Sequence, residues 1–225
     1  MTFLSYFIIL FVLLFLLWGY WRFYFFFRDP GRIVPKGKNL VSPADGKIVY
    51  VKKVKHNEIP IPIKRGRKIN LEESVKTHLR GEKYLIGIFM NPFSVHVNRA
   101  PIAGTVKKIH HYQHKNLPMT LMWLRTMLNL RPFHKFSTHM WENERNIILI
   151  QNKFPVYVIQ IADLAVNKVV CWVKKNQKVS KGQRFGMIKM GSQVDVLVPS
   201  KHVKLVVKEG DNVRAGESIL AKVID

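Results

Sequence analysis

An uncharged apolar segment at the N-terminus restricts the fold more than any other feature of this chain. Residues 3–21, FLSYFIILFVLLFLLWGYW, carry no charged side chain, and the first charged residue along the chain is Arg22. A helix of about 20 apolar residues spans the roughly 30 Å of hydrocarbon in a bilayer. A cleaved signal peptide would begin with basic residues and end at a small-residue cleavage site, and neither is visible here. The sequence therefore predicts a membrane anchor over residues 1–27.

The charge balance indicates which partner the rest of the chain meets. The chain has 37 Lys and Arg against 14 Asp and Glu, a formal net charge of +23, which suits nucleic acid or an anionic membrane equally well. The anchor favours the membrane, where each basic residue near an anionic leaflet contributes about 1 kcal/mol. Because basic flanks stay inside, we expect a cell-membrane protein with a cytoplasmic domain, bound to anionic lipid and not to nucleic acid. Three arginines follow the apolar segment: Arg22, Arg28 and Arg32.

Residues 28–225 are dominated by short strand-like runs. Examples with β-branched residues between turn signals are GKIVYVKKV, KYLIGIFM, NIILIQN and VDVLVP. Short strands without alternating helices predict a mainly β domain, a sandwich or barrel-like fold. One exception, LPMTLMWLRTMLNL at 117–130, predicts a short apolar helix. This helix either packs on the core or dips into the lipid headgroups, and the anchor favours the second interpretation.

Three residues could carry chemistry together, although each has an ordinary structural explanation. Asp45 lies in a Pro-Ala-Asp-Gly turn, His96 at the end of an apolar run, and Ser192 where a bulge residue could be. A serine needs a base to remove its proton, and an aspartate, a histidine and a serine form such a relay on unrelated folds. Gly191 leaves its own carbonyl unshielded, which suits attack by Ser192 on the preceding peptide bond.

Six segments, in this order and spacing, resemble the short form of the phosphatidylserine decarboxylase family. The resemblance covers residues 28–199, most of the part after the anchor, and the last segment is the most specific. The segments are RDPGRIVP, VSPADGKI, IFMNPFSVHVNRAPIAGTV, NERN, QIADLAVNKVVCWV and KGQRFGMIKMGSQVDVLVP.

The resemblance implies a proenzyme that cuts itself between Gly191 and Ser192. Ser192 would attack the Gly191 carbonyl to give an ester, and elimination and hydrolysis would convert Ser192 into a covalent pyruvoyl cofactor. The products would be a large β chain, 1–191, and a small α chain, 192–225, that stay together as a heterodimer. His96 would be the base for Ser192, and Asp45 would hold the histidine tautomer. A higher oligomer remains open.

The same resemblance implies the reaction of the mature enzyme in phospholipid biosynthesis. The pyruvoyl ketone would form a Schiff base with the amine of phosphatidylserine, and loss of carbon dioxide would then give phosphatidylethanolamine. His96 is a candidate for proton transfer in this step, because an unperturbed histidine exchanges protons near neutrality. Whether the lipid is phosphatidylserine or an archaeal ether analogue stays open.

Some residues depart from the family pattern. Asp163, Asn167 and Lys168 stand where the family has Gly and paired arginines, which leaves a headgroup or phosphate contact at this place in doubt. Several histidines lie between residues 107 and 142, but no Cys or carboxylate accompanies them at ligand spacing, so we expect no metal site. They are His110, His111, His114, His134 and His139.

A second hypothesis is a membrane-anchored carrier or adaptor without enzymatic activity. Residues 206–223 have the strand-turn-strand rhythm of biotinyl and lipoyl domains, and Lys189-Met190 could accept the prosthetic group. A carrier lysine lies at the tip of a tight hairpin, whereas Lys189 precedes Gly191-Ser192 inside a strand-like run. The two hypotheses differ in intact mass: cleavage after Gly191 for the enzyme, a lysine adduct for the carrier.

Overall fold

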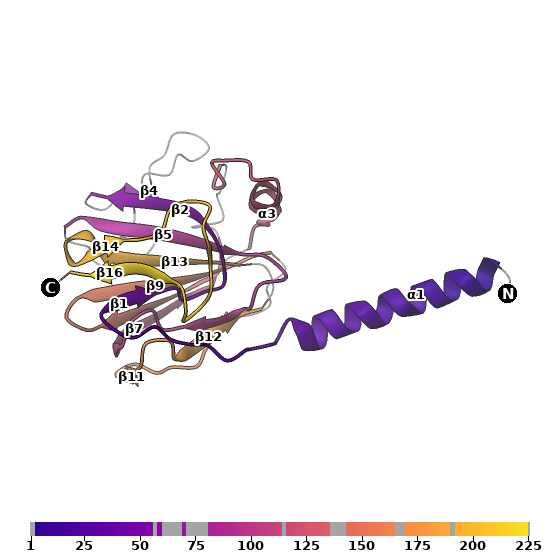
Figure 1. The fold of residues 1–225 in the computed structure, drawn as a ribbon, viewed down its shortest axis with the longest axis horizontal. Coiled ribbons are helices and arrows are strands. Elements are labelled where there is room, and N and C mark those ends of the chain that lie inside the picture. The colour runs from indigo at the N-terminus through magenta and orange to yellow at the C-terminus, as the bar shows by residue number, and fades with distance from the viewer. Residues whose placement is uncertain are drawn as a thin grey trace.

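The computed structural model describes a strand-rich body with one long helix leading away from it (Figure 1). The mainly β prediction is confirmed. The described residues are 3–55, 58–59, 69–70, 81–113, 116–135, 143–164, 169–189 and 192–224.

The long helix is the predicted apolar segment. Helix α1 spans Phe3–Tyr20, contains no buried residue and continues directly into a π-helical turn, η1, at Trp21–Phe25. Together they form one apolar helix of 23 residues, and an 18-residue window of it has a mean hydropathy of 2.4. By length and composition this helix can cross a membrane. In Figure 1, α1 extends away from the body, and none of its side chains is buried.

An eight-stranded antiparallel sheet forms the centre of the body, in the order β11-β7-β8-β9-β13-β5-β2-β15. Strand β13 lies between β9 and β5, and its first residue, Ser192, is opposite Ala162 on one side and Met90 on the other. The strand bounds are β2 Gly46–Val54, β5 Lys83–Met90, β7 Gly104–Tyr112, β8 Arg145–Gln151, β9 Pro155–Ala162, β11 Lys178–Val179, β13 Ser192–Pro199 and β15 Asn212–Val213.

Three smaller sheets complete the described strands. One has the order β1-β16-β14, another the order β10-β12-β6, and β3 pairs with β4. The two strands within residues 206–223 join different sheets: β15 pairs with β2, and β16 pairs with β1 and β14. The bounds are β1 Asn39–Val41, β3 Glu58–Ile59, β4 Ile69–Asn70, β6 Val97–Arg99, β10 Val169–Cys171, β12 Arg184–Ile188, β14 Val203–Leu205 and β16 Ile219–Val223, with a 3₁₀ turn, η2, at Ser200–His202.

Strand β13 is buried on both faces, which explains its continuous apolar sequence. Val194 and Val196 point into one hydrophobic cluster with residues of the neighbouring strands. Leu197 points into a second cluster on the opposite face, where Met122 of helix α3 (Thr120–Met127) also packs. This packing also fixes the position of Ser192, the first residue of the strand.

The apolar helix predicted at 117–130 is present but shorter. Met122 packs on the core, whereas Leu121, Leu124 and Met127 are 44, 43 and 60% exposed. The core-packing interpretation therefore holds for one face of the helix. Contact of the exposed face with lipid headgroups stays a prediction. In Figure 1, α3 lies at the side of the body from which α1 extends.

Candidate functional site

Ser192 is completely buried at the start of β13. Its hydroxyl oxygen lies 3.3 Å from the sulfur of Met90, a weak acceptor. The two flanking strands fix the backbone of Ser192, because its partners Met90 and Ala162 lie in β5 and β9. Gly191, the other residue of the predicted cleavage site, lies outside the described residues.

His96 is also completely buried, immediately before strand β6. Its Nδ1 lies 2.9 Å from the carbonyl oxygen of Ser94. Because a carbonyl can only accept, Nδ1 carries the proton, and Nε2 keeps its lone pair. Nε2 is buried without a hydrogen-bond partner among the described residues. The sequence therefore positions one unused basic nitrogen in the interior.

The environment keeps the His96 ring neutral. Burial is the main cause that lowers its pKa to about 4, and the nearby charge of Arg28 lowers it further. The hydrogen bond to the Ser94 carbonyl acts in the opposite direction. A ring with this pKa is uncharged at neutral pH and is able to accept a proton at Nε2.

Asp45 makes different contacts from those expected. Its carboxylate accepts two hydrogen bonds from Arg32 Nη2, at 3.0 and 2.9 Å, and one from the Ala215 backbone amide at 2.7 Å. No Asp45–His96 hydrogen bond occurs within the described part of the chain. The Ser94 carbonyl holds the His96 tautomer, which was the role that the resemblance implied for Asp45.

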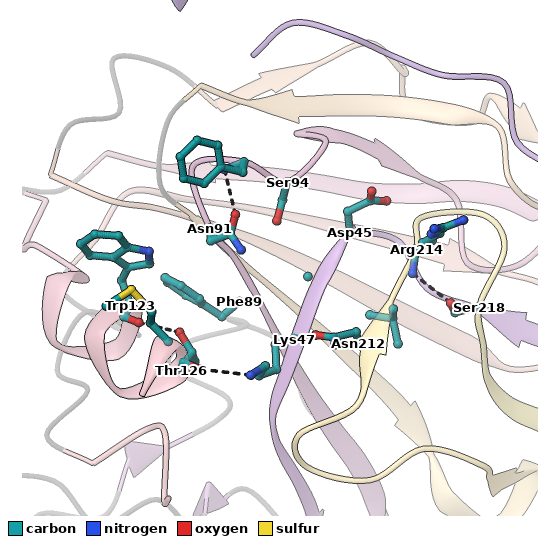
Figure 2. A pocket seen from close by; sticks show the side chains of 14 residues that line it. Asp45, Lys47, Phe89, Asn91, Ser94, Trp123, Thr126, Asn212, Arg214 and Ser218 are labelled. Carbon is teal, nitrogen blue, oxygen red and sulfur yellow. Dashed lines mark hydrogen bonds between the residues drawn. The ribbon is translucent and has the colours of Figure 1, made fainter. Parts of the chain in front are cut away.

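Asp45 and Ser94 both line a cavity of about 630 Å³ (Figure 2). Lys47 lines it as well and donates a hydrogen bond from Nζ to the Thr126 carbonyl of α3, at 3.0 Å. Arg214 adds a second basic side chain to the lining. The Asp45 charge is paired with Arg32, so the remaining charge around the cavity is positive and suits an anionic ligand.

Apolar side chains border the same cavity. They come from β5, the loop before β6, α3 and β15, and two of them are largely exposed, Phe93 at 62% and Met127 at 60%. A cavity with basic groups and an exposed apolar border suits a molecule with a charged head and an apolar tail. The apolar lining residues are Phe89, Phe93, Trp123, Met127 and Val213.

Sequence reasoning missed a buried polar network on β13, beside Ser192. Gln193 Nε2 donates to the Tyr50 hydroxyl at 2.6 Å and to Asp195 Oδ1 at 2.7 Å, and the Tyr50 hydroxyl donates to Asp195 Oδ2 at 2.7 Å. Burial is the main cause that raises the Asp195 pKa to about 7. The available signal was a carboxylate within the apolar run VDVLV, where an unpaired charge would be costly.

The residues that depart from the family pattern are only partly described. Asp163 Oδ1 accepts hydrogen bonds from the backbone amides of Met119 and Leu164, so it fixes the segment that leads into α3. Burial raises the pKa of Asp163. Asn167 and Lys168 lie outside the described residues.

The described histidines of the 107–142 segment are dispersed. His111 pairs with Glu144 at 3.0 Å, and His134 Nδ1 lies 3.4 Å from the Val49 carbonyl. Within the described ranges, no three His, Cys, Asp or Glu side chains are grouped as metal ligands would be. His114 and His139 fall outside these ranges.

Comparison with known proteins gives consistent matches over most of the chain. The family model described as phosphatidylserine decarboxylase matches residues 20–221. A protein of Methanocaldococcus jannaschii, provisionally named archaetidylserine decarboxylase proenzyme, is 37% identical over 201 residues, covering 88% of this chain and 87% of the relative. Phosphatidylserine decarboxylase proenzymes are similar too. That of Syntrophus aciditrophicus is 37% identical over 198 residues (87% of this chain, 76% of the relative). That of Desulfotalea psychrophila is 36% identical over 204 residues (89% and 78%).

Proposed function

The chain belongs to the phosphatidylserine decarboxylase family, and we propose that it is a self-processing, pyruvoyl-dependent enzyme that converts phosphatidylserine to phosphatidylethanolamine and carbon dioxide. The observation that carries the proposal is the combination of a buried Ser192 at the start of a central strand with a buried, neutral His96 whose Nε2 is unused. The proposed reaction is taken from the names of the relatives, and Ser192 and His96 are the proposed nucleophile and base of the self-cleavage.

Maturation begins with Ser192. His96 Nε2 accepts the proton of the hydroxyl, the Ser192 oxygen bonds to the Gly191 carbonyl carbon, and the Gly191–Ser192 carbon–nitrogen bond breaks to leave an ester and a free amine. Elimination then releases the Gly191 carboxylate and leaves dehydroalanine at position 192. This residue tautomerises to an imine, and water hydrolyses it to a pyruvoyl group and ammonia.

Position 192 fits a pyruvoyl group on structural grounds. It is the first residue of a strand and is buried, and His96 is buried as well, with an Nε2 that has no hydrogen-bond partner among the described residues. When present, the pyruvoyl group supplies a carbonyl that withdraws the electron pair left behind by carbon dioxide. His96 is the candidate for holding and returning the proton at Nε2 during this step. Asp45 lines the cavity and is paired with Arg32, and we propose that this pair supports the cavity wall.

The two chains are expected to remain together after the cut as a large chain, 1–191, and a small chain, 192–225. Strand β13 begins the small chain and pairs along its whole length with β5 and over Ser192–Leu197 with β9. The small chain also contributes β14, β15 and β16. Strand β15 pairs with β2 of the large chain, and β16 pairs with β14 and with β1 of the large chain. Cleavage removes one peptide bond and none of these contacts.

The substrate is proposed to enter the cavity beside Asp45 with its charged head inward. Lys47 and Arg214 attract the phosphodiester and carboxylate, and the exposed apolar border of Phe93 and Met127 faces the lipid. The position of α1 and α3 at the same side of the body supports this orientation (Figure 1). We place the catalytic domain, 28–225, on the cytoplasmic side of a cell membrane anchored by 1–27, because basic residues follow the helix.

The test uses the full-length protein in mixed micelles with a single lipid substrate. Phosphatidylserine should yield equal amounts of phosphatidylethanolamine and carbon dioxide, and a Ser192→Ala variant should yield neither. An archaeal ether lipid with the same serine headgroup, measured in parallel, identifies the preferred tail chemistry. Absence of carbon dioxide from both lipids, with folded and cleaved protein, would reject the proposed reaction.

A further inference from the structure

The residues at the end of the membrane helix pack against His96, the proposed catalytic histidine. The Phe26 side chain is completely buried, and its ring centroid lies 4.2 Å from that of His96. Trp21, one turn earlier, contacts both Phe26 at 6.0 Å and Phe93 at 6.4 Å between ring centroids. Phe26 therefore covers one face of the His96 ring, and Trp21 covers Phe26.

Polar contacts fasten the same segment to two sides of the site. Arg28 Nη2 donates to the Phe93 carbonyl at 2.6 Å, in the loop that leads to His96, and Nη1 donates to the Phe25 carbonyl at 2.8 Å. The ammonium of Lys189 lies 5.9 Å from the centre of the Phe27 ring. Lys189 is two residues before Gly191. The segment therefore contacts both the loop that precedes His96 and the residues that precede the cleavage site.

This burial is selective within residues 21–28, which we term the juxtamembrane segment. Phe23 and Tyr24 are 70 and 71% exposed, although they are aromatic as well and lie two or three residues from Phe26 in the sequence. A simple linker between an anchor and a domain does not require one of its aromatic rings to be buried against a histidine, as Phe26 is here. The five π-helical residues of η1 turn Phe26 toward the body, and such turns occur frequently at functional sites.

We propose that Trp21, Phe26 and Arg28 of the juxtamembrane segment form a wall of the self-cleavage site and that Phe26 is a positioning residue for His96. The inference rests on the proposed function, since His96 acts as the base for Ser192 there. Phe26 excludes water from the ring, and together with the Ser94 carbonyl it fixes the direction of Nε2. The membrane anchor and the maturation site are then one structural unit, and the site is incomplete in a chain that lacks residues 21–28.

The first test compares self-cleavage rates of full-length variants synthesised in the presence of lipid nanodiscs. Phe26→Ala should slow the appearance of the small chain about tenfold or more, because even small displacements of a catalytic group are costly. Phe26→Leu keeps an apolar side chain over the ring and should restore most of the rate. Phe23→Ala removes an equal aromatic side chain from the exposed face and is the matched control, expected to cleave at the wild-type rate.

The second test measures the His96 pKa directly in the uncut Ser192→Ala precursor. Histidine-labelled protein is titrated by NMR, and the His96 signal is assigned by its loss in His96→Gln. Removal of Phe26 exposes the ring to water, so the pKa should rise from about 4 toward the ordinary 6.5, whereas Phe23→Ala should leave it unchanged. Arg28 is the charged group that acts on the ring within the described residues, and it is retained in both variants.

The outcomes separate this inference from the function on which it rests. A Phe26→Ala chain that cleaves at the Phe23→Ala rate, with an unchanged His96 pKa, overturns the inference and leaves the decarboxylase assignment intact. Wild-type protein that stays uncut would instead overturn the proposed maturation. If Phe26→Ala does not fold, Phe26→Val replaces it, with slower cleavage and a raised His96 pKa as the expected results and wild-type values as the refuting ones.

Discussion

The buried carboxyl group of Asp195 should make the stability of the uncut protein depend on pH in a defined direction. Asp195 lies three residues after Ser192, completely surrounded by protein apart from a 2% exposed fraction. Burial raises its pKa from 3.8 to about 7, against the opposing effect of hydrogen bonds from Gln193 and Tyr50. The folded state therefore holds this proton over a pH range in which the unfolded chain has released it.

The magnitude follows from proton linkage. A carboxyl whose pKa is raised on folding contributes its stability below pH 3.8, and this contribution is lost as the pH rises through about 7. The total loss is about 4 kcal/mol, of which about 2–3 kcal/mol falls between pH 5 and pH 8. Asparagine at this position has no proton to lose, so Asp195→Asn should lack this part of the pH dependence.

The assay is chemical unfolding in detergent of full-length protein with the Ser192→Ala substitution, followed by near-ultraviolet circular dichroism. The difference in unfolding free energy between the Asp195→Asn variant and its parent cancels the other titrating groups. It should shift in favour of the variant by about 2–3 kcal/mol between pH 5 and pH 8. Asp211→Asn, which removes the same charge from a partly exposed turn, controls for net charge. A difference that is constant across this range would refute the reasoning.

Three further predictions concern the supports of the site. Arg32→Met leaves the Asp45 carboxylate without its guanidinium partner, and since both are largely buried, the free energy of unfolding should fall by about 3 kcal/mol; a loss below about 1 kcal/mol would show that the pair is dispensable. A Cβ at Gly87 would lie 2.3 Å from the Tyr50 ring, so Gly87→Ala should cost about 1–3 kcal/mol, measured in the same unfolding assay, and an unchanged midpoint would contradict it. Lys47→Met should raise the KM for phosphatidylserine severalfold without slowing self-cleavage, and an unchanged KM would remove Lys47 from substrate binding.

The sequence was informative wherever a physical pattern is local. The uncharged run before Arg22 predicted helix α1, because spanning length and apolarity are properties of one segment. The run VDVLVP predicted the core of β13, because a strand buried on both faces is apolar at successive positions. Ser192, which the sequence placed before this run at a possible bulge, is instead the first residue of the strand.

Contacts between distant segments could not be predicted in this way. Asp45 carries no local sign that it binds Arg32 and the amide of Ala215, which is 170 residues away. Phe26 precedes His96 by 70 residues, and an aromatic residue after a membrane helix is ordinarily assigned to the lipid interface. Such pairs depend on how the sheets close, which the spacing of residues does not reveal.

Helix α3 shows how local geometry shortens a predicted element. The apolar pattern extends over 117–130, but the helix ends at Met127. Asn129 adopts a left-handed conformation with φ of 53°, which a helix cannot continue through, and Pro132 follows shortly afterwards. The pattern therefore predicted the existence and type of the element more reliably than its ends.

Self-cleavage after Gly191 can be tested by the intact mass of the purified full-length protein, measured beside a Ser192→Ala variant. We expect two chains in the wild type, divided between Gly191 and Ser192, with the small chain blocked at its N-terminus by a pyruvoyl group, and a single chain in the variant. A single uncut chain in both proteins, or a mass increase on Lys189 without cleavage, would contradict it and favour the carrier hypothesis.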